Sequence, residues 1–398
     1  MPEPAPGART LERVRRPVLE AESLPPAWYV SPEIHAREVE RVFMRAWNLI
    51  GHDSRVKTPG DYAALEFAGV PFVVVRGRDG VVRAFANTCR HKGSRIVSGD
   101  GNARAFKCPY HGWVYALDGA LTGAPQMEHS KNFERRDYGL VPIRLESWGR
   151  LMFVSFDATA PSLMDYLGEL PAALAPYNFD DMIEVRRREF EIGCNWKIYY
   201  ENVMEPYHTP TVHAGGLAGK NEDEGARMLS GNAGELFGAG GEGSPVRLEF
   251  GRNHSAIVSR HAGSRGLLPG DEPFPPIRTL AGRTCEGSIW AYAYPSTTIS
   301  CQREGLWYIE IRPLGPERTA LALGTCFPAE TVRRPDFGAR VEAYYRRLDQ
   351  TAAEDVDVVL EQQRGLASPL ARAGRLSHLE AIPHAFRNWL LDQVLDEP

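Results

Sequence analysis

Two short segments that each pair a cysteine with a histidine constrain this chain more than any other feature. The first holds Cys89 and His91, and the second, after sixteen intervening residues, holds Cys108 and His111. Thiolate sulfur and imidazole nitrogen both bind metals, but only when the fold brings them together. The chain must therefore hold two loops side by side.

The mixed pairing favours an iron–sulfur cluster over a zinc ion. In a Rieske [2Fe–2S] centre, two imidazoles replace two thiolates on one of the two irons, which raises the reduction potential. A structural zinc site is the alternative, but its ligands usually follow the spacing C-x2-4-C and H-x3-5-H. Since each loop here mixes the two types, the sequence predicts Cys89, His91, Cys108 and His111 as ligands of one cluster.

A second group of ligand-type side chains comprises Glu205, His208 and His213. If residues 201–208 are helical, Glu205 and His208 are three apart and share a helix face. Two imidazoles with one carboxylate form the facial triad of non-haem Fe(II), which leaves coordination positions open for oxygen. A surface salt bridge or a buried structural histidine is the alternative interpretation.

A long helix predicted at residues 337–366 offers the third ligand. At about 100° per residue, Asp355 falls in the middle of its apolar face, while Asp357 points almost opposite and Glu354 leans toward solvent. A lone buried carboxylate is costly unless it is paired or bound to a metal. Asp355 is therefore predicted to bind iron, with a buried ion pair to an arginine as the alternative.

The two groups together make the chain resemble the large (alpha) subunit of Rieske non-haem iron oxygenases, from about Trp47 to the C-terminal segment. The resemblance implies the cluster ligands above, and it implies His208, His213 and Asp355 as ligands of a mononuclear Fe(II). Many ring-hydroxylating members carry Asp where Glu205 stands. The order E-N-x-x-E-x-Y-H looks more like the carnitine and glycine-betaine monooxygenase branch.

The resemblance also implies partners. Electrons would come from a separate NAD(P)H-dependent flavin/iron–sulfur reductase, and three subunits would form a ring, because the two metal sites of one subunit lie too far apart in that family. Glu205 would connect the cluster of one subunit to the iron of the next. Glu201 and Asn202 are expected to support Glu205.

The expected reaction is hydroxylation or N-demethylation of a small betaine-like quaternary ammonium compound. Hydroxylation of an aromatic ring or aromatic acid is the alternative, and a Rieske electron-transfer ferredoxin is a third hypothesis, against which the second iron site and the chain length argue. Aromatic rings that could box a cation, or simply pack a sheet against a helix, are Trp290, Tyr292 and Tyr294, with Tyr199, Tyr200 or Trp307 nearby.

The predicted fold class is α+β, with an all-β Rieske domain and a helix-grip (START-like) catalytic domain built on an antiparallel sheet. The expected domains are a segment and helix at 1–44 that pack on the catalytic domain, the Rieske domain at 45–155 and the catalytic domain at 156–398. Residues 1–30 are expected to be loosely held. Strands are expected at 61–67, 70–76, 81–87, 186–196, 246–250, 255–259, 287–294, 297–302, 306–313 and 320–327.

Composition and the remaining motifs exclude other classes. A net charge of −5 predicts no nucleic-acid partner, and no apolar run reaches the ~20 residues that span a bilayer. With no signal core and no disulfide framework among six cysteines, a cytoplasmic protein is expected. The Gly-rich stretch 214–245 is either a cover over the active site or a surface insert. Its G-x-G-x-x-G at 238–243 lacks the strand-to-helix context of a dinucleotide site.

Overall fold

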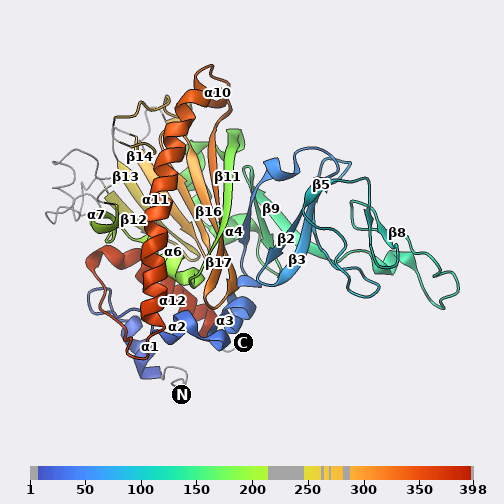
Figure 1. Cartoon of the computed structure of the whole chain (residues 1–398), viewed down its shortest axis with the longest axis horizontal. Coiled ribbons are helices and arrows are strands. Elements are labelled where there is room, and N and C mark those ends of the chain that lie inside the picture. The colour runs from blue at the N-terminus through green and yellow to red at the C-terminus, as the bar shows by residue number, and fades with distance from the viewer. Residues whose placement is uncertain (1–7, 214–245, 261–263, 269, 281–286, 396–398) are drawn as a thin grey trace. The chain divides into compact units, whose positions relative to one another are not determined.

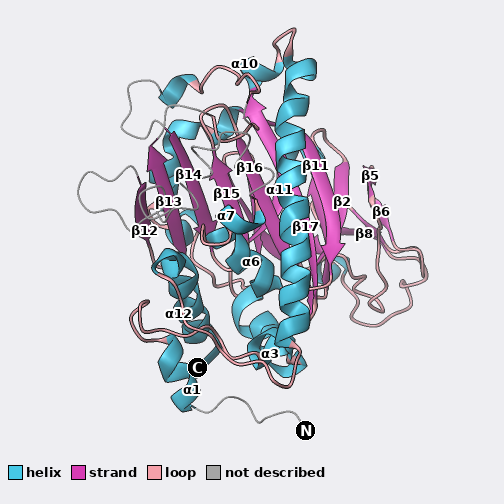
Figure 2. Ribbon diagram, turned by 60° about the vertical axis from the view of Figure 1, so that its left-hand side comes forward, coloured by secondary structure: helices cyan, strands magenta, loops and turns pink. Residues whose placement is uncertain are grey.

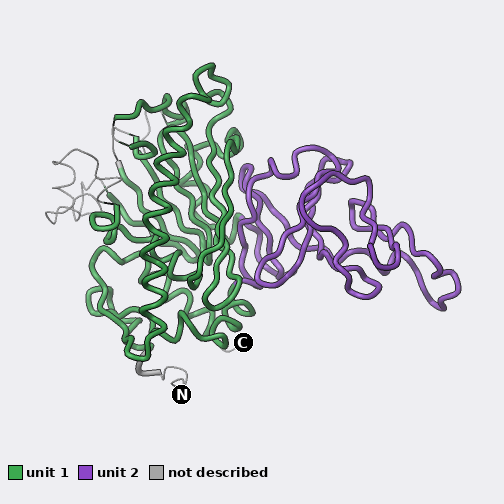
Figure 3. Tube along the Cα trace, in the orientation of Figure 1, with its two compact units in different colours: residues 1–42, 164–398 green, residues 43–163 purple. Residues whose placement is uncertain are grey.

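The computed structural model describes residues 8–213, 246–260, 264–268, 270–280 and 287–395 (Figure 1). The chain forms two compact units: residues 43–163 are unit 2, and residues 1–42 with 164–398 are unit 1 (Figure 3). The stretch 214–245, with its glycine motif, and Cys285 lie outside the described residues.

Unit 2 is built from antiparallel strands. A seven-stranded sheet has the order β1-β10-β9-β4-β3-β2-β5, and a three-stranded sheet has the order β6-β7-β8. Strands β3 and β4 pair as a hairpin across Asp79-Gly80, where Gly80 has a φ of +80°. The strands are β1 Asn48–His52, β2 Asp61–Phe67, β3 Val70–Arg76, β4 Val82–Ala86, β5 Asp100–Asn102, β6 Phe106–Lys107, β7 Val114–Tyr115, β8 Leu121–Gly123, β9 Pro142–Trp148 and β10 Leu151–Ser155.

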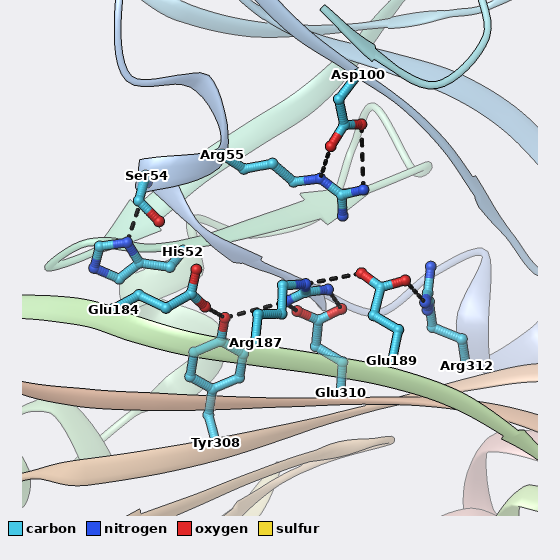
Figure 4. Close-up of polar contacts among 10 residues, drawn as sticks. All are labelled: His52, Ser54, Arg55, Asp100, Glu184, Arg187, Glu189, Tyr308, Glu310 and Arg312. Atoms are coloured by element: carbon cyan, nitrogen blue, oxygen red, sulfur yellow. Dashed lines mark hydrogen bonds and ion pairs between the residues drawn. The ribbon is translucent and has the colours of Figure 1, made fainter. Parts of the chain in front are cut away.

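Polar contacts tie the segments of unit 2 to one another. Arg55 pairs with Asp100 of β5 at 3.2 Å (Figure 4). Residues 156–163 were expected in the catalytic domain, but they belong to unit 2. The indole N–H of Trp47 donates to the carbonyl of Pro161 at 3.0 Å and holds this segment to unit 2.

Unit 1 contains one seven-stranded antiparallel sheet, with the order β11-β17-β16-β15-β14-β13-β12. Its strands are β11 Met182–Ile192, β12 Val246–Phe250, β13 His254–Arg260, β14 Gly287–Ala293, β15 Thr297–Cys301, β16 Leu306–Gly315 and β17 Arg318–Pro328. The strand predicted at 186–196 ends earlier, because the side chain of Asn195 accepts from the N–H of Lys197 and caps the helix that follows.

The two faces of this sheet differ in chemistry, because alternate residues of a strand point to opposite sides. On β16, Trp307 faces the helix layer, whereas Tyr308 and Glu310 face the other way. There Arg187 of β11 makes two hydrogen bonds to Glu310, at 2.6 and 2.9 Å, and the Tyr308 hydroxyl donates to Glu184 (Figure 4). The charged network therefore lies on the face opposite the candidate iron ligands.

Helices cover the other face, and the longest, α11, crosses the sheet (Figures 1 and 2). The bounds of α11 agree with the prediction.

None of the helices in the described part of the chain has the length and apolarity to cross a membrane. The helices are α1 Ala8–Val14, α2 Ala27–Val30, α3 Pro32–Glu38, α4 Leu163–Leu167, α5 Leu170–Leu174, α6 Trp196–Met204, α7 Thr209–Val212, α10 Ala329–Val332, α11 Phe337–Leu366 and α12 Ala381–Leu395, with a π-helical turn at Val39–Phe43 and 3-10 turns at Asp53–Val56, Arg135–Tyr138, Ala175–Tyr177, Phe179–Asp181, Arg278–Leu280 and His378–Glu380.

The expectation that residues 1–30 are loosely held is wrong for the described residues 8–30. Val14, Leu24 and Tyr29 are each at most 2% exposed. The high proline content does not prevent order, because scattered large apolar residues in this stretch have a core against which to pack.

Two buried ion pairs fix the position of α6. Lys197 and Glu201 are four residues apart and lie on one face of α6. Lys197 pairs with Glu38 of α3 at 2.7 Å, and Glu201 accepts from Arg387 of α12 at 2.6 Å. The Glu201 carboxylate also accepts from the hydroxyl of Tyr29. Helices from both ends of the chain therefore hold α6 against the sheet.

Removing one partner of such a pair should destabilise unit 1 strongly. Lys197→Ala leaves the Glu38 carboxylate buried without its cation, which typically costs about 3–5 kcal/mol. A urea titration followed by circular dichroism should show the transition of unit 1 at lower denaturant. The double variant Lys197→Met/Glu38→Gln removes both charges but keeps an acceptor for the indole N–H of Trp196, so it should recover most of the loss. A Lys197→Ala variant as stable as the wild type would contradict the role of the ion pair.

Candidate functional site

The two Cys–His loops of unit 2 share one backbone design. The N–H of Gly93 donates to the carbonyl of Cys89 at 2.8 Å, and the N–H of Gly112 donates to that of Cys108 at 3.1 Å. Both glycines have a φ of +72°, a conformation that residues with a Cβ adopt rarely. Each loop is thus a tight turn that places its cysteine and histidine on the same side.

The four predicted cluster ligands come together between these loops. The Nδ1 atoms of His91 and His111 are 3.1 Å apart, and the thiols of Cys89 and Cys108 are buried. Two thiols and two converging imidazole nitrogens are the donor set of a Rieske cluster, so the residues present fit this group. The His111 side chain is exposed, which leaves one edge of the site open.

The surroundings favour the thiolate form that a metal requires. Burial raises the pKa of the Cys108 thiol, but hydrogen bonds from the backbone N–H groups of Tyr110 and His111 outweigh it and bring the pKa below its ordinary value. The Tyr115 hydroxyl lies 3.3 Å from the Cys89 sulfur. Sequence reasoning missed this contact, because nothing in the spacing of Tyr115 marks it as a neighbour of the cluster.

In unit 1, His208, His213 and Asp355 form a group that can hold a metal ion, with ligand atoms within 4.8 Å of one another. Asp355 Oδ1 lies 3.5 Å from His208 Nε2 and 3.2 Å from His213 Nε2. This oxygen is buried and has no well-aligned hydrogen-bond donor among the described residues. An unsatisfied buried carboxylate oxygen facing two imidazole nitrogens fits a divalent iron ion.

Both histidines have a carboxylate behind them. Glu205 Oε1 lies 2.7 Å from His208 Nδ1, and Glu354 Oε2 lies 2.7 Å from His213 Nδ1. Such contacts select the tautomer with the proton on Nδ1, which leaves the lone pair of Nε2 directed at the metal position. Burial lowers the pKa of His213, but its contacts with Asp355 and Glu354 outweigh this and raise it overall.

The prediction that Glu354 leans toward solvent is wrong. Its side chain is 23% exposed and also accepts from Gln350, one turn earlier on α11, at 3.1 Å. Helix phase alone could not reveal this, because His213 approaches α11 from the side. The neighbouring phase assignments agree with the structure: Asp355 is buried and Asp357 is exposed.

The predicted reason for the Glu205–His208 contact is also wrong. Helix α6 ends at Met204, and Glu205 is extended, with φ −126° and ψ 146°. Pro206 explains the change, because a residue before proline is disfavoured in the helical region. The two side chains meet instead across a turn, in which the Glu205 carboxylate also accepts from the N–H groups of Tyr207 and His208.

The expected support of Glu205 by its helix neighbours is not observed. The Glu201 carboxylate is occupied by Tyr29 and Arg387. The amide nitrogen of Asn202 is buried and has no partner among the described residues. Once α6 ends before Glu205, its neighbours in sequence no longer lie beside it.

The predicted aromatic box is only partly present. Tyr292 donates its hydroxyl to the carbonyl of Val203 at 2.8 Å, and Tyr294, beyond the end of β14, packs on Trp389 of α12. These rings therefore join sheet to helices. Trp290 is half-buried and contacts Trp307 edge to face, with centroids 6.1 Å apart, so these two indoles remain as a candidate wall.

Comparisons with known proteins match both parts of the chain. Residues 46–134 match the Rieske [2Fe-2S] domain, and residues 179–396 match the ring hydroxylating alpha subunit (catalytic domain). The chain is 28% identical over 383 residues to the chloroplastic choline monooxygenase of Spinacia oleracea, covering 94% of this chain and 79% of that protein. It is 36% identical over 199 residues to the carnitine monooxygenase oxygenase subunit of Escherichia coli (strain K12), covering 49% and 53%.

A solved structure has the same fold over nearly the whole chain. A quaternary ammonium Rieske monooxygenase, studied for carnitine oxidation and inter-subunit electron transfer, superposes with a TM-score of 0.77 at 23% identity and covers 97% of this chain and 98% of its own. The chain therefore belongs to the family of ring-hydroxylating alpha subunits, and it is an oxygenase that joins a Rieske [2Fe–2S] domain to a catalytic domain for mononuclear iron.

Proposed function

We propose that this oxygenase hydroxylates or N-demethylates a small quaternary ammonium compound, using O2 and electrons from a separate NAD(P)H-dependent reductase. The observation that carries the oxygenase chemistry is the group of His208, His213 and Asp355, with a carboxylate behind each imidazole. The substrate class rests on the choline- and carnitine-oxidising relatives and on the indole wall of Trp290 and Trp307, since indole faces attract cations.

Each metal group has its own set of residues in this proposal. Cys89, His91, Cys108 and His111 would hold the cluster, and the triad of unit 1 would hold Fe(II). When bound, the cluster supplies electrons one at a time, and the iron offers open coordination positions for oxygen. Glu205 and Glu354 hold the two imidazoles in the ligating tautomer.

We further propose a homotrimer in which Glu205 connects the cluster of one subunit to the iron site of the next. Its carboxylate is 14% exposed and is followed by Tyr207, 59% exposed, so this turn is accessible to another chain. In unit 2, the exposed His111 and Tyr110 offer a matching surface. The structural relative studied for inter-subunit electron transfer supports this arrangement.

A substrate panel tests the proposed function. The purified oxygenase with a surrogate reductase should consume NADH and oxygen when choline, glycine betaine, L-carnitine or γ-butyrobetaine is added, and at least one should give an oxidised product. Benzoate and naphthalene represent the aromatic alternative. Turnover of an aromatic compound, with none of any trimethylammonium compound, would contradict the proposed substrate class.

A further inference from the structure

One buried cation near the iron triad has no role in the sites described so far. Arg347 is 5% exposed and lies on the same buried face of α11 as Asp355. The eight-residue spacing places their backbones about 12 Å apart along the helix axis. The guanidinium carbon lies 5.3 Å from the ring centroid of Trp307, one of the two indoles of the candidate wall.

Among the described residues, Arg347 lacks the carboxylate partner that the buried Arg387 and the half-buried Arg187 have. Arg387 contacts Glu201 at 2.6 Å, and Arg187 contacts Glu310 at 2.6 Å. No carboxylate in the described ranges pairs with Arg347, and its buried Nε has no hydrogen-bond acceptor among them. A buried charge without a partner costs free energy, so an anion that binds beside Arg347 should stabilise the protein.

The charge of Arg347 persists despite its burial. Burial lowers its pKa to about 10, with the carboxylates of Asp355 and Glu354 opposing the shift and Arg265 adding to it. The guanidinium is therefore cationic at neutral pH. A planar guanidinium matches a carboxylate through two parallel hydrogen bonds, a geometry that an ammonium group does not offer.

We propose that Arg347 binds a carboxylate of the substrate, so that this oxygenase acts on a trimethylammonium carboxylate and not on a choline-like alcohol. The inference rests on the proposed function and narrows it. The carboxylate end pairs with Arg347 beside Trp307, and the cationic end lies toward Trp290 and the iron triad. Arg347 is thus a specificity-determining residue, because an uncharged end group leaves the guanidinium unpaired.

Binding measurements on the iron-loaded protein under anaerobic conditions test the assignment. Arg347→Gln should weaken γ-butyrobetaine binding in isothermal titration by about 10- to 100-fold, the range for losing hydrogen bonds to a charged group. Arg347→Lys should retain part of the affinity. The neighbouring Arg346 provides the control, since it is 60% exposed and pairs with Asp271, so Arg346→Gln should bind as the wild type does.

A comparison of ligands separates the charge effect from loss of structure. Choline has no carboxylate, so its weaker binding should be the same in wild type and Arg347→Gln, which also reports whether the variant is folded. If that variant does not fold, Arg347→Lys decides the question. Unchanged γ-butyrobetaine affinity in whichever variant folds, or choline binding as tight as γ-butyrobetaine in the wild type, overturns the proposal.

Benzoate distinguishes this inference from the proposed function. Arg347-dependent binding of benzoate, with no binding of any trimethylammonium compound, would support the carboxylate contact and remove the proposed substrate class. Binding of trimethylammonium alcohols alone would support the proposed substrate class and remove the carboxylate contact of Arg347. Absence of binding by every carboxylate tested would overturn the role of Arg347.

Discussion

Asp355→Ala is expected to empty the mononuclear iron site while the visible spectrum of the cluster persists. Asp355 Oδ1 faces both imidazoles of the triad, and the cluster ligands lie in the other unit. Loss of a supporting residue costs about 10- to 100-fold in metal affinity, and loss of a ligand should cost more. Metal analysis should show a fall from about three to about two iron atoms per chain, with inorganic sulfide unchanged.

Asp357 supplies the matched control for this change. It lies two residues further along α11 and is exposed, so Asp357→Ala should keep its iron and its activity. Full iron content in Asp355→Ala, or iron loss in Asp357→Ala, would show that the triad has been assigned to the wrong carboxylate.

Glu205→Gln is expected to keep both metal groups but to slow electron delivery to the iron site by more than about 100-fold, beyond the usual effect of an outer ligand contact. The glutamine side chain can place its one oxygen where Glu205 Oε2 accepts from the N–H groups of Tyr207 and His208, so the turn should survive, and its amide nitrogen then faces His208 Nδ1. The negative charge proposed to connect neighbouring subunits is lost. Stopped-flow mixing of the reduced protein with substrate and oxygen should then show slow cluster reoxidation.

Glu354→Gln separates that bridging role from a simple effect on the imidazoles. Glu354 contacts His213 just as Glu205 contacts His208, each at 2.7 Å, but it lies on α11 and not on the accessible turn after α6. Its replacement should slow reoxidation by about 10- to 100-fold, the usual effect of losing a contact behind a metal ligand. Equal slowing in both variants would remove the bridging role, and iron loss in Glu205→Gln would give Glu205 a more direct part in holding the metal.

Elements with a strong hydrophobic periodicity could be predicted from the sequence. The apolar face of α11 is long enough to fix its phase, so the helix bounds and the burial of Asp355 agree with expectation. The strands expected from short β-rich segments are present in both units, although β1, β9 and β10 of unit 2 were not predicted, and the α+β class is confirmed by the structural match. The roles of the site residues stay predictions, although the structure brings His208, His213 and Asp355 together.

Contacts made by chain segments that turn or arrive from elsewhere could not be predicted in this way. Pro206 ends α6 before Glu205, so a helical spacing gave the right neighbour of His208 for the wrong reason. The partner of Glu354 comes from the segment after α7, and the partners of Glu201 come from α2 and from α12. Arg347 has no sequence signature, since it stands out only through its burial without a carboxylate partner in the part of the chain that the structure describes.

A single-turnover experiment can show whether this oxygenase converts trimethylammonium carboxylates. The protein, with both metal groups loaded, is reduced, freed of reductant and mixed with γ-butyrobetaine and oxygen, and the products are identified by mass spectrometry. We expect an oxidised product of γ-butyrobetaine or of another trimethylammonium carboxylate, formed only when oxygen is admitted, and much less product from choline. Conversion of an aromatic compound by the same loaded protein, with no product from any trimethylammonium carboxylate, would contradict it.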